Sequence, residues 1–177
     1  SEVAYKLLLQ DTYPSWLYPI TNGATTMWER WNSYTKEDGF GPVEMNSFNH
    51  YAYGAVGEWL YQSVGGIAPD PAHPGYKVVR IAPQMEGPLH SARLSLKARS
   101  GTFQVRWKCR RGSAVMKITV PHGCLAHVDL PTSKWQSVEL NGEAVTRKYK
   151  LSPRTQAACR LSLPTGSFEV KCLMANV

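Results

Sequence analysis

Two short segments in the first third of the chain carry the side chains that could do chemistry. The first reads Thr-Thr-Met-Trp-Glu-Arg-Trp-Asn and places Glu29 between Trp28 and Trp31. The second reads Asn-Ser-Phe-Asn-His-Tyr-Ala-Tyr-Gly, in which the histidine is His50. Tryptophan rings can stack on the apolar face of a pyranose, a carboxylate can take up a proton, and imidazole can hydrogen-bond a hydroxyl. These residue types predict a site that processes carbohydrate.

Each of these residues also has a purely structural explanation. Thr26 and Glu29 have the spacing of a capping box, in which a hydroxyl and a carboxylate satisfy backbone amides at the start of a helix. Trp28 and Trp31 would lie on one turn of that helix, where they could pack in a core. His50 could equally be a satisfied core or capping histidine. From the residues alone, the catalytic and the structural interpretations both stay open.

The elements that would position these residues are helical in the first part of the chain. Apolar spacing predicts a helix over residues 3–10, and the capping pattern predicts a short helix from Thr26 to about Asn32. A third helix is predicted over about 47–63, with aromatic or polar loops between the three. It should bury one apolar stripe, formed by Ala52, Val56, Trp59 and Leu60.

A proline-rich connector over 67–75 ends the helical region, and beyond it apolar residues alternate with polar ones. This period of two, broken by Gly-containing turns, predicts an antiparallel β-sandwich of roughly eight strands. The expected strands are 77–81, 92–99, 103–109, 114–120, 125–130, 136–140, 158–163 and 167–172. The predicted fold class is α+β, with domains at 1–71 and 72–177.

Charge is distributed unevenly between these two predicted domains. The chain has 177 residues and a net charge of +7, of which −5 falls in residues 1–71 and +12 in residues 72–177. Such asymmetry indicates two units with different surfaces. No apolar run is long enough to span a membrane, no signal peptide is visible, and no nucleic-acid-binding motif accompanies the charge. We therefore expect neither a membrane nor a nucleic acid as a partner.

The basic half suggests a second function that does not involve catalysis. Arg106, Lys108, Arg110 and Arg111 lie near one predicted hairpin and could hold an anionic polysaccharide. The alternative is that they simply occupy solvent-facing strand positions and favour solubility.

Four cysteines, all in the basic half, match no zinc signature, and we expect no metal or cofactor. Their even number permits two disulfides. Cys159 and Cys172 flank a turn almost symmetrically and could pair across antiparallel strands, which would leave Cys109 to pair with Cys124. Free thiols remain the alternative, because cysteine is a common core residue. Disulfides would favour a secreted or extracellular location.

The two aromatic segments resemble the end of the catalytic domain of α-L-rhamnosidases of glycoside hydrolase family 78. The resemblance is strong over residues 14–77 and looser through the β region, which is similar to the C-terminal sandwich of that family. It implies that residues 1–71 form the last helices of an (α/α)6 barrel. It also implies that Glu29 is the general base of an inverting hydrolase, and that His50, Trp28 and Trp31 line a rhamnose pocket.

The resemblance also implies that part of the catalytic machinery is missing. Inverting glycosidases pair a base with a general acid, and the family places that acid in an earlier part of the barrel, which no segment here resembles. Glu37, Asp38 and Glu44 lie in a polar loop, where burial cannot raise a pKa as an acid requires. We therefore expect an incompetent C-terminal portion of a rhamnosidase that needs the rest of the barrel. The alternative is a lectin-like or polyanion-binding module.

A purely structural role is the third hypothesis, in which the sandwich packs against a barrel and supplies no chemistry. The helical segment would then leave Trp16, Trp28 and Trp31 partly wet. This predicts self-association or a non-covalent partner that covers the aromatic face, besides a rhamnose-containing glycan as ligand.

Overall fold

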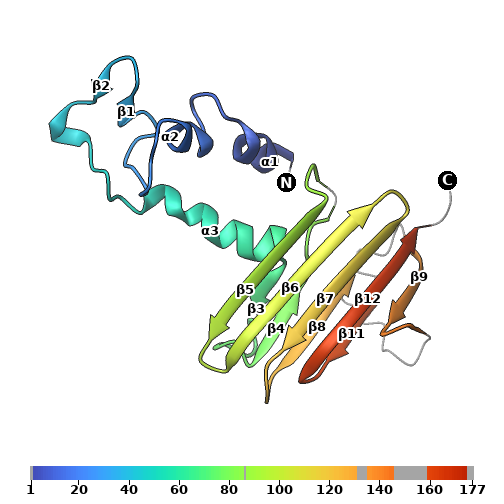
Figure 1. Ribbon diagram of the computed structural model, residues 1–177. Helices are drawn as coiled ribbons and strands as arrows, with labels where there is room; N and C mark the ends of the chain where they lie inside the picture. Colours follow the sequence, from blue (N-terminus) through green and yellow to red (C-terminus); the bar gives the residue numbers. More distant parts are fainter. Residues whose placement is uncertain (1, 86, 131–134, 146–158, 175–177) are drawn as a thin grey trace. The chain divides into compact units, whose positions relative to one another are not determined.

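The computed structural model describes residues 2–85, 87–130, 135–145 and 159–174 (Figure 1). The chain divides into two compact units, Ser1–Trp59 and Leu60–Val177, which we call the first and second unit. The sequence pattern and the charge distribution predicted the boundary between the two domains later, between residues 71 and 72. The compact division falls earlier because Ile67–Pro69, read from its prolines as a connector, is a strand that pairs with Val78–Ile81.

The first unit contains little regular structure. Helix α1 (Glu2–Leu9) forms where apolar spacing predicts it, and a short α2 (Leu17–Thr21) interrupts the aromatic loop that follows. Two-residue strands β1 (Tyr34–Thr35) and β2 (Gly39–Phe40) form a hairpin, which leads to the 3-10 turn η1 (Val43–Met45). The short helix predicted from Thr26 is absent, because residues 26–30 are not helical.

A helical region over residues 52–64 follows, made of η2 (Ala52–Ala55), α3 (Val56–Trp59) and the π-helical turn η3 (Leu60–Val64). It begins five residues later than predicted. Its apolar stripe is not buried as expected: Ala52 is exposed, while Val56, Trp59 and Leu60 are only half-buried. Trp59 nevertheless packs edge-on against the buried ring of Tyr5 in α1, at a centroid distance of 5.1 Å.

The second unit is built on a six-stranded antiparallel sheet in the order β10-β9-β12-β7-β6-β5. Strands β5, β6 and β7 are linked by hairpins, occupy one end of this order and lie side by side in Figure 1. The six strands are β5 (Ser91–Ala98), β6 (Gly101–Arg110), β7 (Ser113–Val120), β9 (Trp135–Leu140), β10 (Glu143–Ala144) and β12 (Gly166–Met174).

A four-stranded sheet in the order β11-β8-β4-β3 completes the second unit, and Figure 1 shows it stacked behind the larger sheet. Its strands are β3 (Ile67–Pro69), β4 (Val78–Ile81), β8 (Leu125–Leu130) and β11 (Cys159–Leu163). All its pairings are antiparallel except that of β4 with β8, which is parallel. The α+β class and the mostly antiparallel sheets are thus as predicted.

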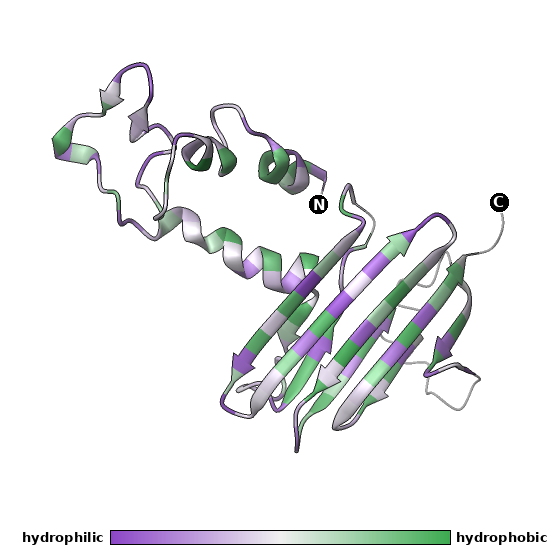
Figure 2. Cartoon of the chain, in the orientation of Figure 1, coloured by the Kyte–Doolittle hydropathy of each residue, from purple (hydrophilic) through white to green (hydrophobic). Residues whose placement is uncertain are grey.

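The hydrophobic core lies between these two sheets. Hydropathy alternates along β5, β6, β7 and β12, as Figure 2 shows, so each strand turns one row of apolar side chains inward. The largest fully buried side chains include Trp107 and Phe103 of β6. The indole Nε1 of Trp107 donates a hydrogen bond of 2.7 Å to the carbonyl oxygen of Val64, which satisfies its buried polar atom.

The structure bears on one of the two disulfide predictions, that of Cys109 with Cys124. Cys124 carries a free thiol, so the predicted Cys109–Cys124 disulfide is wrong. The two residues lie at opposite ends of β7, Cys109 opposite Ala114 and Cys124 four residues after the strand ends. Strands β11 and β12, which carry Cys159 and Cys172, belong to different sheets and are not neighbours in a hairpin, and the predicted Cys159–Cys172 disulfide stays a prediction. The side chain of Cys159 lies outside the described residues.

Candidate functional site

The segments that carry Glu29 and His50 lie side by side in the first unit, joined by hydrogen bonds of an antiparallel pair. The amide of His50 donates to the carbonyl oxygen of Met27 at 2.8 Å, and the amide of Glu29 donates to that of Ser47 at 2.8 Å. The hydroxyl of Thr26 donates to the carbonyl oxygen of Phe48. This pairing satisfies backbone groups in a region without a helix or strand, and it places the two candidate residues on neighbouring segments.

Glu29 is held by a backbone amide across this pair. Its Oε2 accepts a hydrogen bond of 2.7 Å from the amide of Ser47, and the side chain is half-buried. The capping-box interpretation is therefore wrong, since the carboxylate contacts Ser47 and not the amide of Thr26. Within the part of the chain that the structure describes, Oε1 has no hydrogen-bond partner. One oxygen orients the carboxylate while the other can receive a proton.

The imidazole of His50 is oriented by its own backbone turn. Its Nδ1 lies 3.3 Å from the amide nitrogen of Ala52 and accepts that hydrogen bond, so the neutral ring carries its proton on Nε2. The ring stacks on Tyr51 at a centroid distance of 5.8 Å and is half-buried. His50 thus presents a hydrogen-bond donor suited to a sugar hydroxyl.

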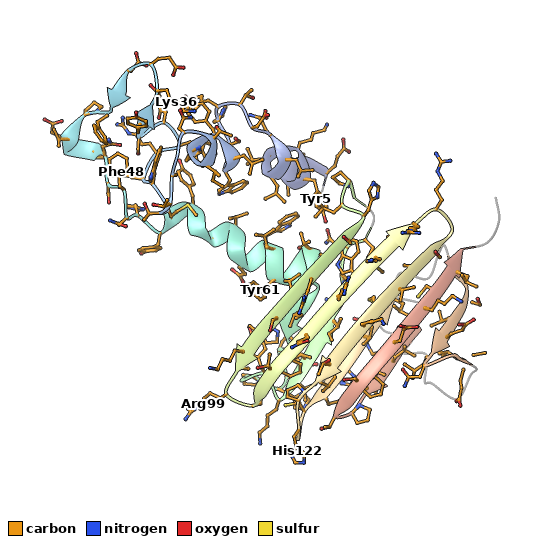
Figure 3. The ribbon with its side chains drawn as sticks, viewed as in Figure 1. Tyr5, Lys36, Phe48, Tyr61, Arg99 and His122 are labelled. Carbon is orange, nitrogen blue, oxygen red and sulfur yellow. The ribbon has the colours of Figure 1, made fainter. Side chains whose placement is uncertain are left out.

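Trp28 is a core residue of the first unit. Its exposed fraction is 6%, and its ring makes edge contacts with Tyr34 and Phe48, at centroid distances of 6.4 and 5.3 Å. Phe40 makes an edge contact with Phe48, which is labelled in Figure 3, and so belongs to the same aromatic cluster. Successive side chains of an extended segment point to opposite sides, so Trp28 anchors the segment while Glu29 stays accessible. A buried ring of this kind cannot receive a sugar, contrary to its predicted place in a pocket.

Trp31 occupies a second aromatic group. Its ring stacks on Tyr53 at 4.5 Å and meets Trp16 edge-on at 6.0 Å, while Trp16 donates its indole hydrogen to the carbonyl oxygen of Tyr53. The Nε1 atom of Trp31 is buried without a partner in the described part of the chain. Trp31 is half-buried, and the ring face against Tyr53 is not available to a sugar.

The backbone contacts of Ser47 and Met27 are features of the site that sequence reasoning missed. Both hold the site together through main-chain atoms, which every residue type offers, so the sequence carried no signal for them. The loop carboxylates Glu37, Asp38 and Glu44 are all exposed.

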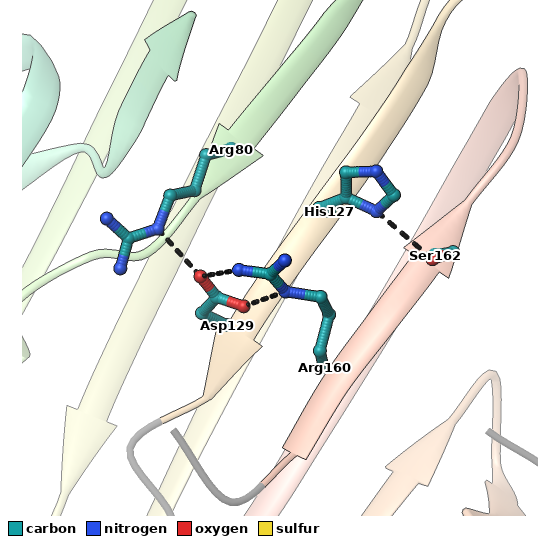
Figure 4. Close-up of polar contacts among 5 residues, drawn as sticks. All are labelled: Arg80, His127, Asp129, Arg160 and Ser162. Atoms are coloured by element: carbon teal, nitrogen blue, oxygen red, sulfur yellow. Dashed lines mark hydrogen bonds and ion pairs between the residues drawn. The ribbon is translucent and has the colours of Figure 1, made fainter. Parts of the chain in front are cut away.

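A second polar group lies on the smaller sheet of the second unit, around Asp129 (Figure 4). Arg160 contacts the carboxylate through Nε and Nη2, the latter at 2.8 Å, and Arg80 contacts it through Nε at 2.7 Å. Burial raises the pKa of Asp129, but hydrogen bonds from Arg160 and Arg80 outweigh it and hold the pKa below its ordinary value. A general acid needs the opposite shift, so this carboxylate is structural.

Apolar exposure is concentrated in the first unit. Among the described residues, all of the large apolar side chains exposed to solvent belong to this unit except Tyr61. Val43, Tyr51 and Val3 are the most exposed, at 90%, 89% and 79%. The first unit buries only Tyr5 and Trp28 among the apolar side chains of the described core. None of the helices in the described ranges has the length and hydrophobicity needed to cross a bilayer.

Two family profiles match consecutive parts of the chain. Residues 1–64 match the bacterial alpha-L-rhamnosidase 6 hairpin glycosidase domain, and residues 66–145 match the bacterial alpha-L-rhamnosidase C-terminal domain. The chain therefore corresponds to the C-terminal part of a bacterial alpha-L-rhamnosidase, namely the end of the six-hairpin glycosidase domain followed by the C-terminal domain.

Individual relatives agree with this assignment. An alpha-L-rhamnosidase of Formosa agariphila is 41% identical over 170 residues, which is 95% of this chain and 18% of the relative. One from Streptomyces avermitilis is 50% identical over 131 residues, or 74% of this chain and 12% of the relative. The chain thus spans less than a fifth of the length of these relatives.

Solved structures give the same result. The Streptomyces avermitilis alpha-L-rhamnosidase complexed with L-rhamnose superposes with a TM-score of 0.80 and 39% identity, covering 96% of this chain and 16% of that one. The enzyme from Dictyoglumus thermophilum gives a TM-score of 0.79 and 29% identity, covering 97% of this chain and 19% of that one.

Proposed function

We propose that this chain supplies the general base and part of the sugar pocket of an inverting α-L-rhamnosidase. The observation that carries the proposal is the antiparallel pair that brings Glu29 and His50 onto neighbouring segments, with one oxygen of Glu29 held by the amide of Ser47. The similarity to rhamnosidases, one of them solved with L-rhamnose, supports the choice of sugar.

In this proposal Glu29 acts on the water that attacks the sugar. The free Oε1 takes a proton from that water as its oxygen bonds to the anomeric carbon, and the bond to the leaving oxygen breaks. The Nε2–H of His50 donates to a hydroxyl of the rhamnose and fixes the ring. Trp31 remains a candidate for a contact with the sugar, whereas Trp28 supports the segment from behind.

The leaving oxygen must take a proton from a general acid, which inverting enzymes hold about 6.5–9.5 Å from the base. Neither Asp70 nor Asp129 suits this role, because the pKa of each lies below its ordinary value; for Asp70 the main cause is the hydrogen bond from the amide of Ala72. We therefore place the acid in the remainder of the barrel. The chain alone should not turn over substrate.

The experiment joins this chain to the preceding portion of the Formosa agariphila relative, in place of that enzyme's own C-terminal part, and assays an aryl α-L-rhamnoside. Glu29→Gln should lower kcat by about 10²–10⁴-fold, because it removes the proton acceptor without changing shape. Glu44→Gln, at an exposed carboxylate of the same unit, is the matched control and should leave kcat unchanged. Turnover that survives Glu29→Gln would refute the assignment of the base. Turnover by the isolated chain would refute its incompetence.

A further inference from the structure

The outward face of the six-stranded sheet carries a row of cations on adjacent strands. Arg93 of β5 lies directly opposite Arg106 of β6, which lies opposite Lys117 of β7, and all three are exposed. Like charges that face one another across a sheet are destabilising. A row of three is therefore unfavourable for folding, which points to a role other than stability.

The carboxylates of this face neutralise only part of the charge. Glu169, on β12, pairs with Lys117 at 3.2 Å, and Glu139, on β9, pairs with Lys171 at 3.5 Å. Within the described ranges, Arg93 and Arg106 have no carboxylate partner. Two guanidinium groups therefore remain on the same row, each with planar donors that match a carboxylate or sulfate in two-point contact.

A depression of about 500 Å³ lies over these residues. Arg93, Arg106 and Lys117 line it together with neutral hydrogen-bonding side chains, namely Gln104, Thr119, Ser167 and Asn141. A smaller depression of about 200 Å³ adjoins it, shares Arg106 and Lys117, and adds Lys108. The lining of the larger depression also includes the carboxylate of Glu169, which pairs with Lys117, and the ring of Phe168.

We propose that this face, which we call the cationic row, binds an anionic polysaccharide through the carboxylate or sulfate groups of its sugars. The guanidinium groups of Arg93 and Arg106 take the charged groups, while the amides and hydroxyls take sugar hydroxyls. Phe168 is the only aromatic side chain among the described residues that line the two depressions, whereas a platform for single-stranded DNA stacks successive bases on several rings; this favours a glycan. The residues that line this face are not those proposed for the rhamnose pocket, and the proposal does not depend on that pocket.

The test measures binding of the whole chain to short oligogalacturonides by calorimetry, with fully methyl-esterified oligomers as the uncharged control. Binding should occur with the free acid, weaken with added salt and disappear with the ester. Sulfated dextran oligomers form a second arm, and preference for one of the two acids identifies the anionic group. Absence of binding to both acids would overturn the proposal.

Variants locate the site. The double substitution Arg93→Gln and Arg106→Gln should weaken binding by about tenfold or more, since each removes a hydrogen bond to a charged group. The matched control is Arg99→Gln with Lys77→Gln, which removes the same charge from two exposed positions of the second unit; Arg99 is labelled in Figure 3. The control should bind with less than about twofold loss, because it touches neither depression. Equal losses in both double variants would show attraction by net charge alone and refute the site.

Two further measurements distinguish binding at the cationic row from misfolding of the variant and from general affinity for polyanions. The Arg93→Gln and Arg106→Gln variant should melt at the same temperature as the native chain or higher, because repulsion is removed. Gln104→Glu, which keeps the shape and adds a negative charge in the depression, should also weaken binding. If Gln104→Glu binds as tightly as the native chain, or a DNA oligonucleotide binds better than either acidic glycan, the proposal fails.

Discussion

His50 has two ring nitrogens with separate tasks, since Nδ1 accepts the amide hydrogen of Ala52 and Nε2 is left to donate. Asparagine approximates the position of the first nitrogen and glutamine that of the second. These two amides can therefore separate a conformational role of His50 from a role in binding the sugar.

At this scale we predict opposite effects for the two substitutions in the joined enzyme described above. His50→Gln should keep the donor to the sugar and retain most of kcat/KM, while destabilising the turn. His50→Asn should keep the turn and lower kcat/KM by about tenfold, the loss expected for one hydrogen bond to a neutral group. Steady-state kinetics measure the change in kcat/KM, and thermal melting measures the change in stability. Similar kinetics for both variants would assign His50 to structure alone.

Glu29 shows why a local sequence pattern can mislead at the residue scale. Its spacing from Thr26 fits a capping box, yet both side chains bond to the neighbouring segment, to Ser47 and Phe48. The pattern could identify a carboxylate that needs an amide, but not which amide, because the partner lies eighteen residues away. The identity of the candidate base came from the resemblance to a family, and its partner only from the fold.

At the scale of elements, the strands were the most predictable part. The strand predicted over 125–130 is β8, because one face of each strand is buried and the period of two is then strict. The pairing of the strands was not predictable, as the parallel contact of β4 with β8 and the separation of β11 from β12 show. Those choices depend on packing between segments far apart in the sequence.

The ion pairs of Asp129 connect three strands, β4, β8 and β11, so we predict a strong effect of Asp129→Asn on the second unit. Near neutral pH the free energy of unfolding should fall by about 3 kcal/mol, since Arg160 and Arg80 lose their counter-charge. Glu143→Gln, at an exposed carboxylate of the same unit, should change it by less than about 0.5 kcal/mol. Denaturant titration provides both values.

The ion pairs of Asp129 also make the free energy of unfolding depend on pH. The pKa of Asp129 is lower in the folded chain than in the unfolded one, so its contribution is complete above the unfolded pKa of about 3.9. It is lost as pH falls from there through the folded pKa. The difference in stability between the native chain and Asp129→Asn should therefore shrink below about pH 4. A difference that stays constant down to the acid transition would contradict this account.

At the scale of the whole molecule, the two units differ in how much apolar surface they bury. Nearly all of the described core belongs to the second unit, while the first exposes Val43, Met45 and Phe40. Exposed apolar surface of this extent marks an interaction site. In the proposed function, the rest of the barrel covers this exposed apolar surface of the first unit.

We accordingly predict that the isolated chain self-associates as its concentration rises. Val43→Glu should weaken association, because it places a charge in an apolar contact. Thr25→Glu adds the same charge at an exposed polar position of the same unit and should not. Sedimentation velocity measures the association of the native chain and of the two variants. A native chain that stays monomeric at high concentration would contradict the prediction.

The hydrogen bond to the carbonyl oxygen of Val64 decides where a recombinant C-terminal domain should begin. The glycosidase-domain profile ends at residue 64 and the C-terminal profile begins at 66, which invites a cut between them. Val64 nevertheless accepts the indole hydrogen of Trp107, so a recombinant sandwich that begins at residue 66 leaves that buried donor without its acceptor. The omitted bond is worth about 1–3 kcal/mol when the donor stays buried. An expressed sandwich domain should instead begin at Leu60, where the second compact unit starts.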